Sequence, residues 1–202
     1  MISIEKLLSF DRNDLLEVSK TIGKEELPLF VEWLSEKDDE IRYQALLLLQ
    51  HRSLYCNDVY PFWDIFCKKL KSENSYQRSI GLMLIADNAR WDTDNRHDDT
   101  IDEYLLLLND EKPITVRQCI QALCKIVPYK NHLHHKIVNK LMTIKISEIK
   151  ETMRKLILLD ILSVLVIIRK YQTIDEVEKY IIDALTGGLL DKKAIKQVKS
   201  MM

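Results

Sequence analysis

The sequence predicts an all-α fold, and three observations lead to it. Only four Gly and four Pro interrupt the 202 residues, whereas Leu, Ile, Lys and Glu are abundant and strong alternating β-branched runs are absent. A hydrophobic content of 47% suits one domain or one elongated array with a sizeable core. Finally, one apolar helical pattern recurs along the chain at a nearly constant interval.

The recurring pattern is aligned by an arginine. The arginines lie 36, 39 and 37 residues apart, and they are Arg42, Arg78, Arg117 and Arg154. Small or aliphatic residues follow each arginine after three and after six or seven positions, which places them on one stripe of a helix. The residue six positions before the arginine is acidic (Glu36, Glu111, Glu148), except for Ser72. The residue just before it is apolar (Ile41, Val116, Met153), except for Gln77.

Each repeat is expected to be a pair of helices joined by a short turn. The predicted pairs are 25–35 with 40–53, 57–72 with 75–89, 100–109 with 114–128, 132–144 with 150–170, and 174–187 with 190–201. The tetrapeptide TIDE occurs at Thr100–Glu103 and again 73 residues later at Thr173–Glu176. Both copies have the sequence of a capping box, so each is expected to begin a helix.

Such pairs cannot bury their apolar faces alone, so they must stack on one another. We therefore expect a single domain over residues 1–202, a right-handed α-solenoid of about five helix pairs. Its repeats cover roughly residues 25–53, 57–90, 100–128 and 132–170, followed by a degenerate C-terminal cap at 174–201.

The pattern resembles HEAT repeats, over about residues 25–170 and more weakly beyond. The family has a proline in the first helix, an acidic residue in the turn, and an apolar residue and an arginine early in the second helix. Pro28, Glu36, Ile41 and Arg42 match all four positions, and armadillo-like arrays have similar periods. The resemblance implies a structural ladder of acids and arginines between adjacent repeats, made of Glu36, Arg42, Arg78, Glu111, Arg117, Glu148 and Arg154.

In such solenoids the second helices usually line the concave face, so their outward positions are candidates for binding a partner protein. By register the candidate partner-binding residues are Tyr43, Gln44, Ser79, Gln118 and Lys155. The alternative is that these side chains simply face water or the next repeat.

Charge is distributed unevenly along the chain. Residues 1–110 carry 22 acidic and 13 basic side chains, a net charge of −9, and residues 111–202 carry 9 acidic and 17 basic, a net charge of +8. The basic half is therefore the one expected to meet an anionic partner such as nucleic acid. The four cysteines form no CxxC pair and no leader peptide precedes them, so we expect a cytoplasmic protein. The longest apolar run, Leu156–Ile168, is too short for a membrane span.

The stretch ARWDTDNRHDDTIDEY, residues 89–104, concentrates acidic side chains together with two arginines, a histidine and a tryptophan. Asp92, Asp94 and Glu103 fall at calcium-loop positions 1, 3 and 12, but Arg96 and His97 occupy positions 5 and 6, and position 6 requires glycine. We therefore interpret Trp91–Asp99 as a joint between helices, in which Trp91 and Asp92 have no assigned role. His132, His134 and His135 lack a neighbouring carboxylate or cysteine, so no metal site is predicted there.

These observations predict a non-catalytic scaffold or adaptor that binds a partner protein, as a monomer and without a cofactor, a metal or a membrane. The alternative is a DNA-binding HEAT-like protein related to alkylpurine DNA glycosylases, because Trp91 and Asp92 with Arg117 downstream resemble the aromatic and acidic residues of that family. Against it, this sequence has a single Trp-Asp in a loop and an acidic first half, which repels phosphate. A basic C-terminal patch could also bind nucleic acid without chemistry, and it includes Lys192, Lys193, Lys196 and Lys199.

Overall fold

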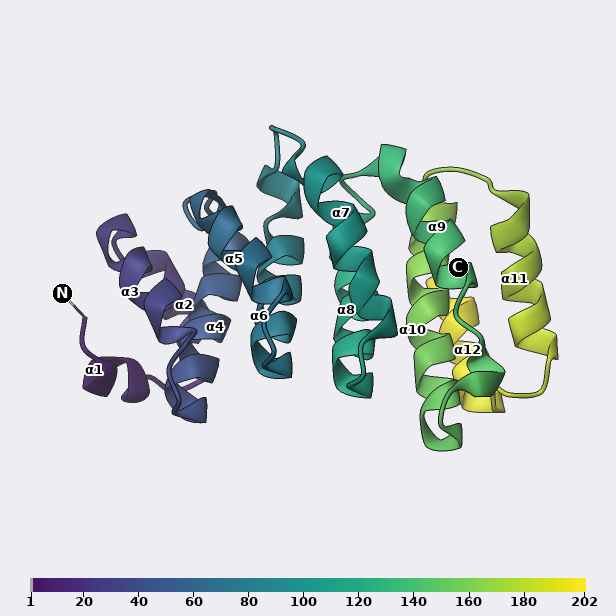
Figure 1. Cartoon of the computed structure of the whole chain (residues 1–202), viewed down its shortest axis with the longest axis horizontal. Coiled ribbons are helices and arrows are strands. Elements are labelled where there is room, and N and C mark those ends of the chain that lie inside the picture. Colours follow the sequence, from purple (N-terminus) through teal and green to yellow (C-terminus); the bar gives the residue numbers. More distant parts are fainter. Residues whose placement is uncertain (1) are drawn as a thin grey trace. The chain divides into compact units, whose positions relative to one another are not determined.

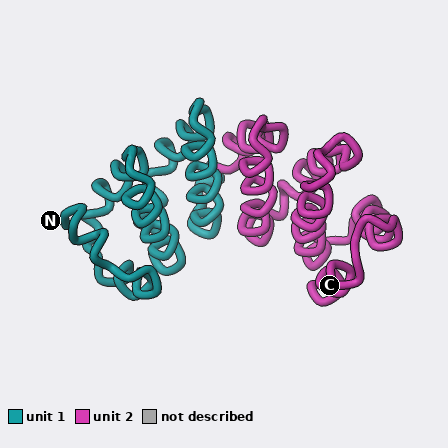
Figure 2. Tube along the Cα trace, turned by 90° about the horizontal axis from the view of Figure 1, so that it is seen from below, with its two compact units in different colours: residues 1–96 teal, residues 97–202 magenta. Residues whose placement is uncertain are grey.

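The computed structural model describes residues 2–202, and these form twelve α-helices, six short 3-10 helices and no strand. The predicted all-α class is thus confirmed. Two compact units divide the chain, residues 1–96 and 97–202 (Figures 1 and 2).

The first unit is built around one long helix. Its helices are α1 (Ile4–Leu8), α2 (Leu15–Thr21), α3 (Leu27–Trp33), α4 (Asp39–Ser53), α5 (Trp63–Leu70) and α6 (Ser75–Asp87). Helix α4 packs against α1, α2, α3 and α6, and α5 packs against α6. Both second helices have side-chain caps: Asp38 accepts the backbone N–H groups of Glu40 and Ile41, and Asn74 accepts that of Tyr76.

The contact between α5 and α6 depends on a glycine. A β-carbon at Gly81 of α6 would lie 2.7 Å from the carbonyl oxygen of Phe66 and 3.2 Å from the β-carbon of Lys69, both on α5. Only glycine permits this approach of the two helices. It lets Phe66, Leu82 and Leu84 bury themselves completely, each contributing roughly 2 kcal/mol to the free energy of folding.

The second unit is organised around the apolar helix α10. Its helices are α7 (Arg96–Leu106), α8 (Pro113–Ile126), α9 (His134–Met142), α10 (Glu151–Arg169), α11 (Asp175–Thr186) and α12 (Lys192–Met201). Helix α10 packs against each of α8, α9, α11 and α12, so its apolar run is core. Within residues 2–202, no helix combines the length and the apolar character that crossing a bilayer requires.

The predicted helices occur where the repeat places them, and a helix begins at the second TIDE copy, but not at the first, and neither threonine is the N-cap of a helix. Helix α7 begins at Arg96, so Thr100 lies inside it and is buried. Asp92 makes the earlier start possible, because its Oδ1 accepts the backbone N–H of Arg96 at 2.8 Å. At the second copy, Ile174 precedes the first residue of α11 and no side chain caps it.

The repeat arginines bind the turn before their own helix. Arg42 Nη1 donates to the carbonyl oxygen of Glu36 at 2.7 Å, and Arg78 Nη1 to that of Ser72 at 2.8 Å. Arg154 likewise donates through Nε to the carbonyl of Ile149 at 2.8 Å. The backbone of the turn, six or five residues back, is therefore an acceptor that these three arginines share.

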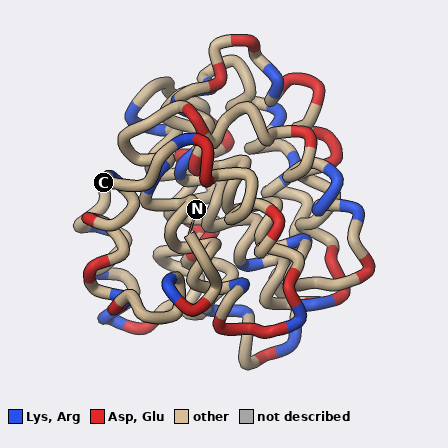
Figure 3. Tube along the Cα trace, turned by 90° about the vertical axis from the view of Figure 1, so that its left-hand side faces the viewer, with Lys and Arg blue, Asp and Glu red and all other residues tan. Residues whose placement is uncertain are grey.

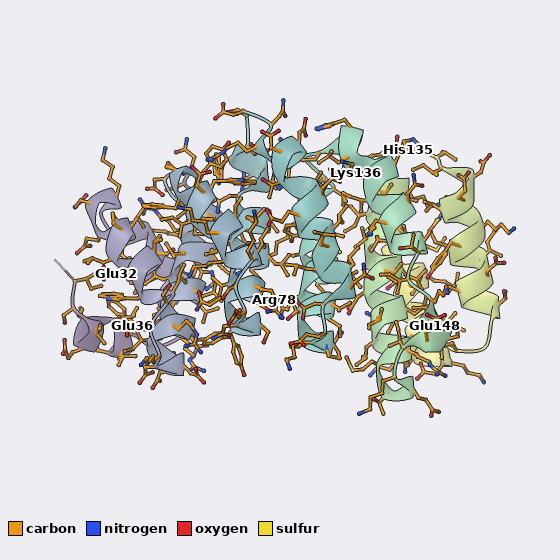
Figure 4. All side chains as sticks on the ribbon, in the orientation of Figure 1. Glu32, Glu36, Arg78, His135, Lys136 and Glu148 are labelled. Carbon is orange, nitrogen blue, oxygen red and sulfur yellow. The ribbon has the colours of Figure 1, made fainter. Side chains whose placement is uncertain are left out.

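The ladder acids lie apart from these bonds. Glu111 lies 3.5 Å from the ammonium of Lys112, and Glu148 lies 2.9 Å from that of Lys145, both on exposed turns. Figure 4 labels Glu36, Arg78 and Glu148. The arginine of the third repeat, Arg117, instead makes a two-pronged ion pair with Asp160 of α10, through Nε at 2.6 Å and Nη2 at 3.2 Å.

Candidate functional site

The candidate partner-binding residues have different surroundings. Tyr43 is exposed, whereas Ser79, Gln118 and Lys155 are half-buried. Lys155 forms an ion pair with Asp191, the N-cap of α12. Gln44 requires a correction: it is 2% exposed, and its Nε2 donates to the carbonyls of Leu7 at 3.3 Å and Phe10 at 3.2 Å. Its amide fastens α1 to α4, which leaves it inaccessible to a partner.

Two tyrosines near the starts of second helices are exposed beside arginines. The Tyr43 ring on α4 is 46% exposed, with the Arg12 guanidinium 5.1 Å from its centroid. The Tyr76 ring on α6 is 65% exposed, with the Arg42 guanidinium 5.5 Å from its centroid. Each cation steadies an aromatic surface that remains open to solvent.

A groove of about 640 Å³ lies beside Tyr76, and we call it the Lys69 groove. Three segments of the first unit line it: the turn from α3 into α4, the last turns of α5, and the start of α6. The lining residues are Ser35, Glu36, Lys37, Asp39, Arg42, Ile65, Lys68, Lys69, Ser72, Asn74, Tyr76 and Gln77.

Lys69 is 7% exposed although it carries an amine. Its Nζ donates to Ser35 Oγ at 3.0 Å and to Gln77 Oε1, and the Gln77 amide donates in turn to the carbonyl of Leu34 at 2.7 Å. Burial, and secondarily the charge of Arg42, lower the pKa of the Lys69 ammonium to about 8. A perturbed amine lining a groove is a recognised sign of a functional site.

The repeat itself shows that Lys69 occupies an unusual position. Nine residues before the repeat arginine stand Trp33 in the first repeat and Leu108 in the third, both apolar and buried, and Lys145 in the fourth, which is exposed, so Lys69 is the one buried lysine at this position. Lys69 takes this place in the second repeat, and its partner Gln77 stands where the other repeats have an apolar residue. The buried lysine and the polar departure from the repeat thus meet through one hydrogen bond, and Gln77 is the sequence signal for the groove.

In the first half of the acidic stretch 89–104, Trp91 and Asp92 are held by hydrogen bonds to other segments of the chain. Asp92 is 5% exposed and accepts the hydroxyl of Tyr60 at 2.8 Å in addition to the backbone N–H of Arg96. Burial and this carboxylate raise the pKa of Tyr60. Trp91 donates from its indole to the carbonyl of Ser53 at 2.7 Å. Trp91 and Asp92 therefore fasten the joint to earlier helices.

A second groove, of about 800 Å³, lies in the second unit between α7 and α9. Leu106, 63% exposed, supplies its apolar surface. Lys136 and Asp102 form an ion pair at 2.8 Å at its rim.

The predicted histidine cluster is divided between two environments. His134 is buried and its Nε2 hydrogen-bonds the carbonyl oxygen of Val127 at 2.7 Å, and burial lowers its pKa. His132 instead contacts Asp98 at 2.6 Å on the surface. In residues 2–202, no three His, Cys, Asp or Glu side chains come together as metal ligands would.

Basic side chains of the second unit are matched by carboxylates of the same unit. Residues 97–202 hold 17 basic and 14 acidic side chains, so their net charge is only +3. Over the whole chain, Lys and Arg positions lie among Asp and Glu positions along the trace (Figure 3). The four lysines Lys192, Lys193, Lys196 and Lys199 are all exposed on α12.

No protein-family model matches the chain, and no curated protein matches its sequence. Among solved structures, the chain is similar to the crystal structure of an engineered protein from the Northeast Structural Genomics Consortium. The two share 17% sequence identity with a TM-score of 0.54, over 100% of this chain and 98% of the other. At this identity the likeness concerns the fold alone.

Proposed function

We propose that the chain is a non-catalytic protein-interaction module, a right-handed α-solenoid of about five HEAT-like helix pairs. It acts as a cytoplasmic monomer and binds a partner along the exposed positions of its second helices. The packing within each unit supports this architecture: second helix contacts second helix in α4 with α6, and α10 contacts both α8 and α12. The repeated arginine bonds to the turns support the equivalence of the pairs.

The exposed tyrosines beside arginines carry the functional part of the proposal. Tyr43 and Tyr76 present large, rigid and amphipathic surfaces near the starts of two neighbouring second helices. Tyrosine and arginine are the residue types enriched where protein interfaces gain most of their affinity. Such side chains contribute little to the stability of an isolated chain while they are exposed, so a partner protein accounts for them better than the fold does.

Affinity capture from the native lysate tests the proposal. The immobilised chain recovers one stoichiometric protein, and isothermal titration with the purified partner then gives its Kd. We expect the double variant Tyr43→Ala and Tyr76→Ala to raise Kd by roughly 10- to 100-fold, as the loss of two central interface residues does. The matched control is Tyr55→Ala, because Tyr55 is 53% exposed beside Lys20 in the same unit but follows the other end of α4. Equal affinities for all three proteins would reject this surface.

The nucleic-acid alternative is supported by the four exposed lysines of α12. Capture at low and at moderate salt distinguishes it, because phosphate contacts release counterions and lose affinity steeply as salt rises. DNA recovered at low salt and released at moderate salt, with no protein partner, would favour it over the adaptor.

A further inference from the structure

We propose that the Lys69 groove binds the carboxylate of an acidic side chain on the partner protein, with an apolar neighbour of that residue lying over Ile65 and Tyr76. This inference rests on the proposed protein-interaction function and names the chemistry that one part of the surface recognises. It is carried by three features of the groove: an incompletely satisfied buried ammonium, a net positive lining, and an exposed apolar edge.

The first feature is the hydrogen-bonding capacity of Lys69. A protonated ammonium has three N–H donors. Two are used by Ser35 Oγ and Gln77 Oε1, both neutral oxygens. Among residues 2–202, no carboxylate forms an ion pair with Lys69, although its side chain lines the groove. A buried cation without a counterion is unfavourable, so an incoming anion regains both a hydrogen bond and a charge pair.

The second feature is the charge of the lining. Four cations line the groove against two carboxylates, Glu36 and Asp39, which leaves a net charge of +2 when Lys69 is protonated. The guanidinium of Arg42 is already engaged by the carbonyl of Glu36 and the carboxylate of Asp39. One free ammonium donor and a modest positive excess suit a singly charged carboxylate better than a phosphate dianion, which prefers a free arginine fork.

The third feature is the apolar edge. Ile65 is 40% exposed on α5, and Tyr76 stands 65% exposed at the start of α6. An extended segment that inserts an acidic side chain toward Lys69 therefore has apolar surface for the residue beside it. Glutamate or aspartate next to an aliphatic residue is the sequence that this combination favours.

The test is a titration followed by NMR of the lysine side chains at pH 6.5, with the Lys69 signal assigned by its absence in Lys69→Met. Three probes are compared: the blocked dipeptide acetyl-Glu-Leu-amide, its neutral analogue acetyl-Gln-Leu-amide, and inorganic phosphate. We expect the Glu dipeptide to shift the Lys69 signal with a millimolar Kd and the Gln dipeptide to bind at least 10-fold more weakly. Equal binding of the two dipeptides would overturn the proposal, and tighter binding of phosphate would assign the groove to a phosphoryl group instead.

Variants then locate the effect. Lys69→Met should weaken binding of the Glu dipeptide at least 10-fold, whereas Lys68→Met, which removes an exposed charge from the same helix, should weaken it no more than about 3-fold. Glu36→Gln removes a competing carboxylate from the lining and should strengthen binding about 2-fold. Circular dichroism of each variant establishes that it is folded, and unchanged binding by folded Lys69→Met would refute the site.

The pH dependence provides a second readout. Binding of the Glu dipeptide should weaken by several fold between pH 7 and pH 9, because the pKa of the Lys69 ammonium is about 8, and this change should be absent in Lys69→Met. The other ionisable groups of the lining are Glu36, Lys37, Asp39, Arg42, Lys68 and Tyr76. Because the dipeptide needs no partner, failure of the titration removes this inference alone, whereas failure of the wild-type chain to capture a protein removes the proposed function.

Discussion

Two cations, one in each unit, are held largely out of water, and they differ in whether a carboxylate neutralises their charge. Arg117 in the second unit is held by both oxygens of Asp160, and Gln121 supports that carboxylate at 2.9 Å. Lys69 in the first unit has only the neutral oxygens of a serine and a glutamine. The paired charge completes the packing of α8 on α10 and is structural. The unpaired charge leaves a donor that a partner can use.

The largest expected effect comes from breaking the pair. Asp160→Asn keeps the shape of the side chain but leaves the guanidinium of Arg117 without its counterion in a poorly hydrated place. We expect the free energy of unfolding to fall by about 3 kcal/mol. Urea denaturation followed by far-UV circular dichroism measures it. The double variant Arg117→Met and Asp160→Leu should lose less than Asp160→Asn, since an apolar pair of similar volume needs no counterion. A greater loss of unfolding free energy in the double variant would show that the ion pair stabilises the fold more than an apolar pair of similar volume does.

Removal of the unpaired charge in Lys69→Met should raise the free energy of unfolding, whereas Asp160→Asn lowers it. The effect of Lys69→Met should also be smaller. The folded pKa of Lys69 is about 8, below the ordinary value of 10.5, so between these values the unfolded chain binds more protons than the folded chain. The contribution of Lys69 to stability therefore rises as pH increases from 8 to 10.5 and is least favourable below pH 8. We expect the stability of the wild type, relative to Lys69→Met, to rise by on the order of 1 kcal/mol over that window, less than the full shift implies because the groove admits water.

Parallel urea curves for the two proteins at pH 7, 9 and 10.5 measure this difference. Subtraction of the Lys69→Met values cancels the titration of groups that the two chains share. A difference independent of pH would mean that the Lys69 ammonium keeps its charge through the window.

The smallest effect is expected for an exposed pair. Lys155 and Asp191 have side chains 42% and 56% exposed. Lys155→Ala should leave the midpoint of urea denaturation unchanged within error, because water and salt screen such a contact. Asp191→Ala is the informative control, since Asp191 also caps α12 by accepting the backbone N–H of Ala194 at 2.8 Å. A lower midpoint for Asp191→Ala alone would assign its stabilising role to the cap.

Sequence periodicity predicted the helix pairs because the spacing of apolar residues along a helix is a local property. It missed what depends on contacts between distant segments. The register predicts an exposed Gln44 because the short helix α1, which covers it, carries no repeat signal. The TIDE pattern predicts a cap at Thr100 because the competing carboxylate, Asp92, lies eight residues earlier, beyond the span of a capping box.

The Lys69 groove was missed for a similar reason. Its ammonium is held between a serine 34 residues away and a glutamine eight residues away, and no local pattern contains all three. Departure of Gln77 from the repeat was visible in the sequence, but its meaning required knowing which side chain lies opposite.

Gly81 links the packing of α5 on α6 to recognition. The absence of a side chain at Gly81 determines how close the backbone of Lys69 lies to α6. The width of the groove is therefore set by a residue that does not line it. Gly81→Ala would move the two walls apart without altering a single charge. One methyl group outside the lining would thereby act as a spacer. It would change the affinity for an acidic segment while every residue that contacts the segment stays the same.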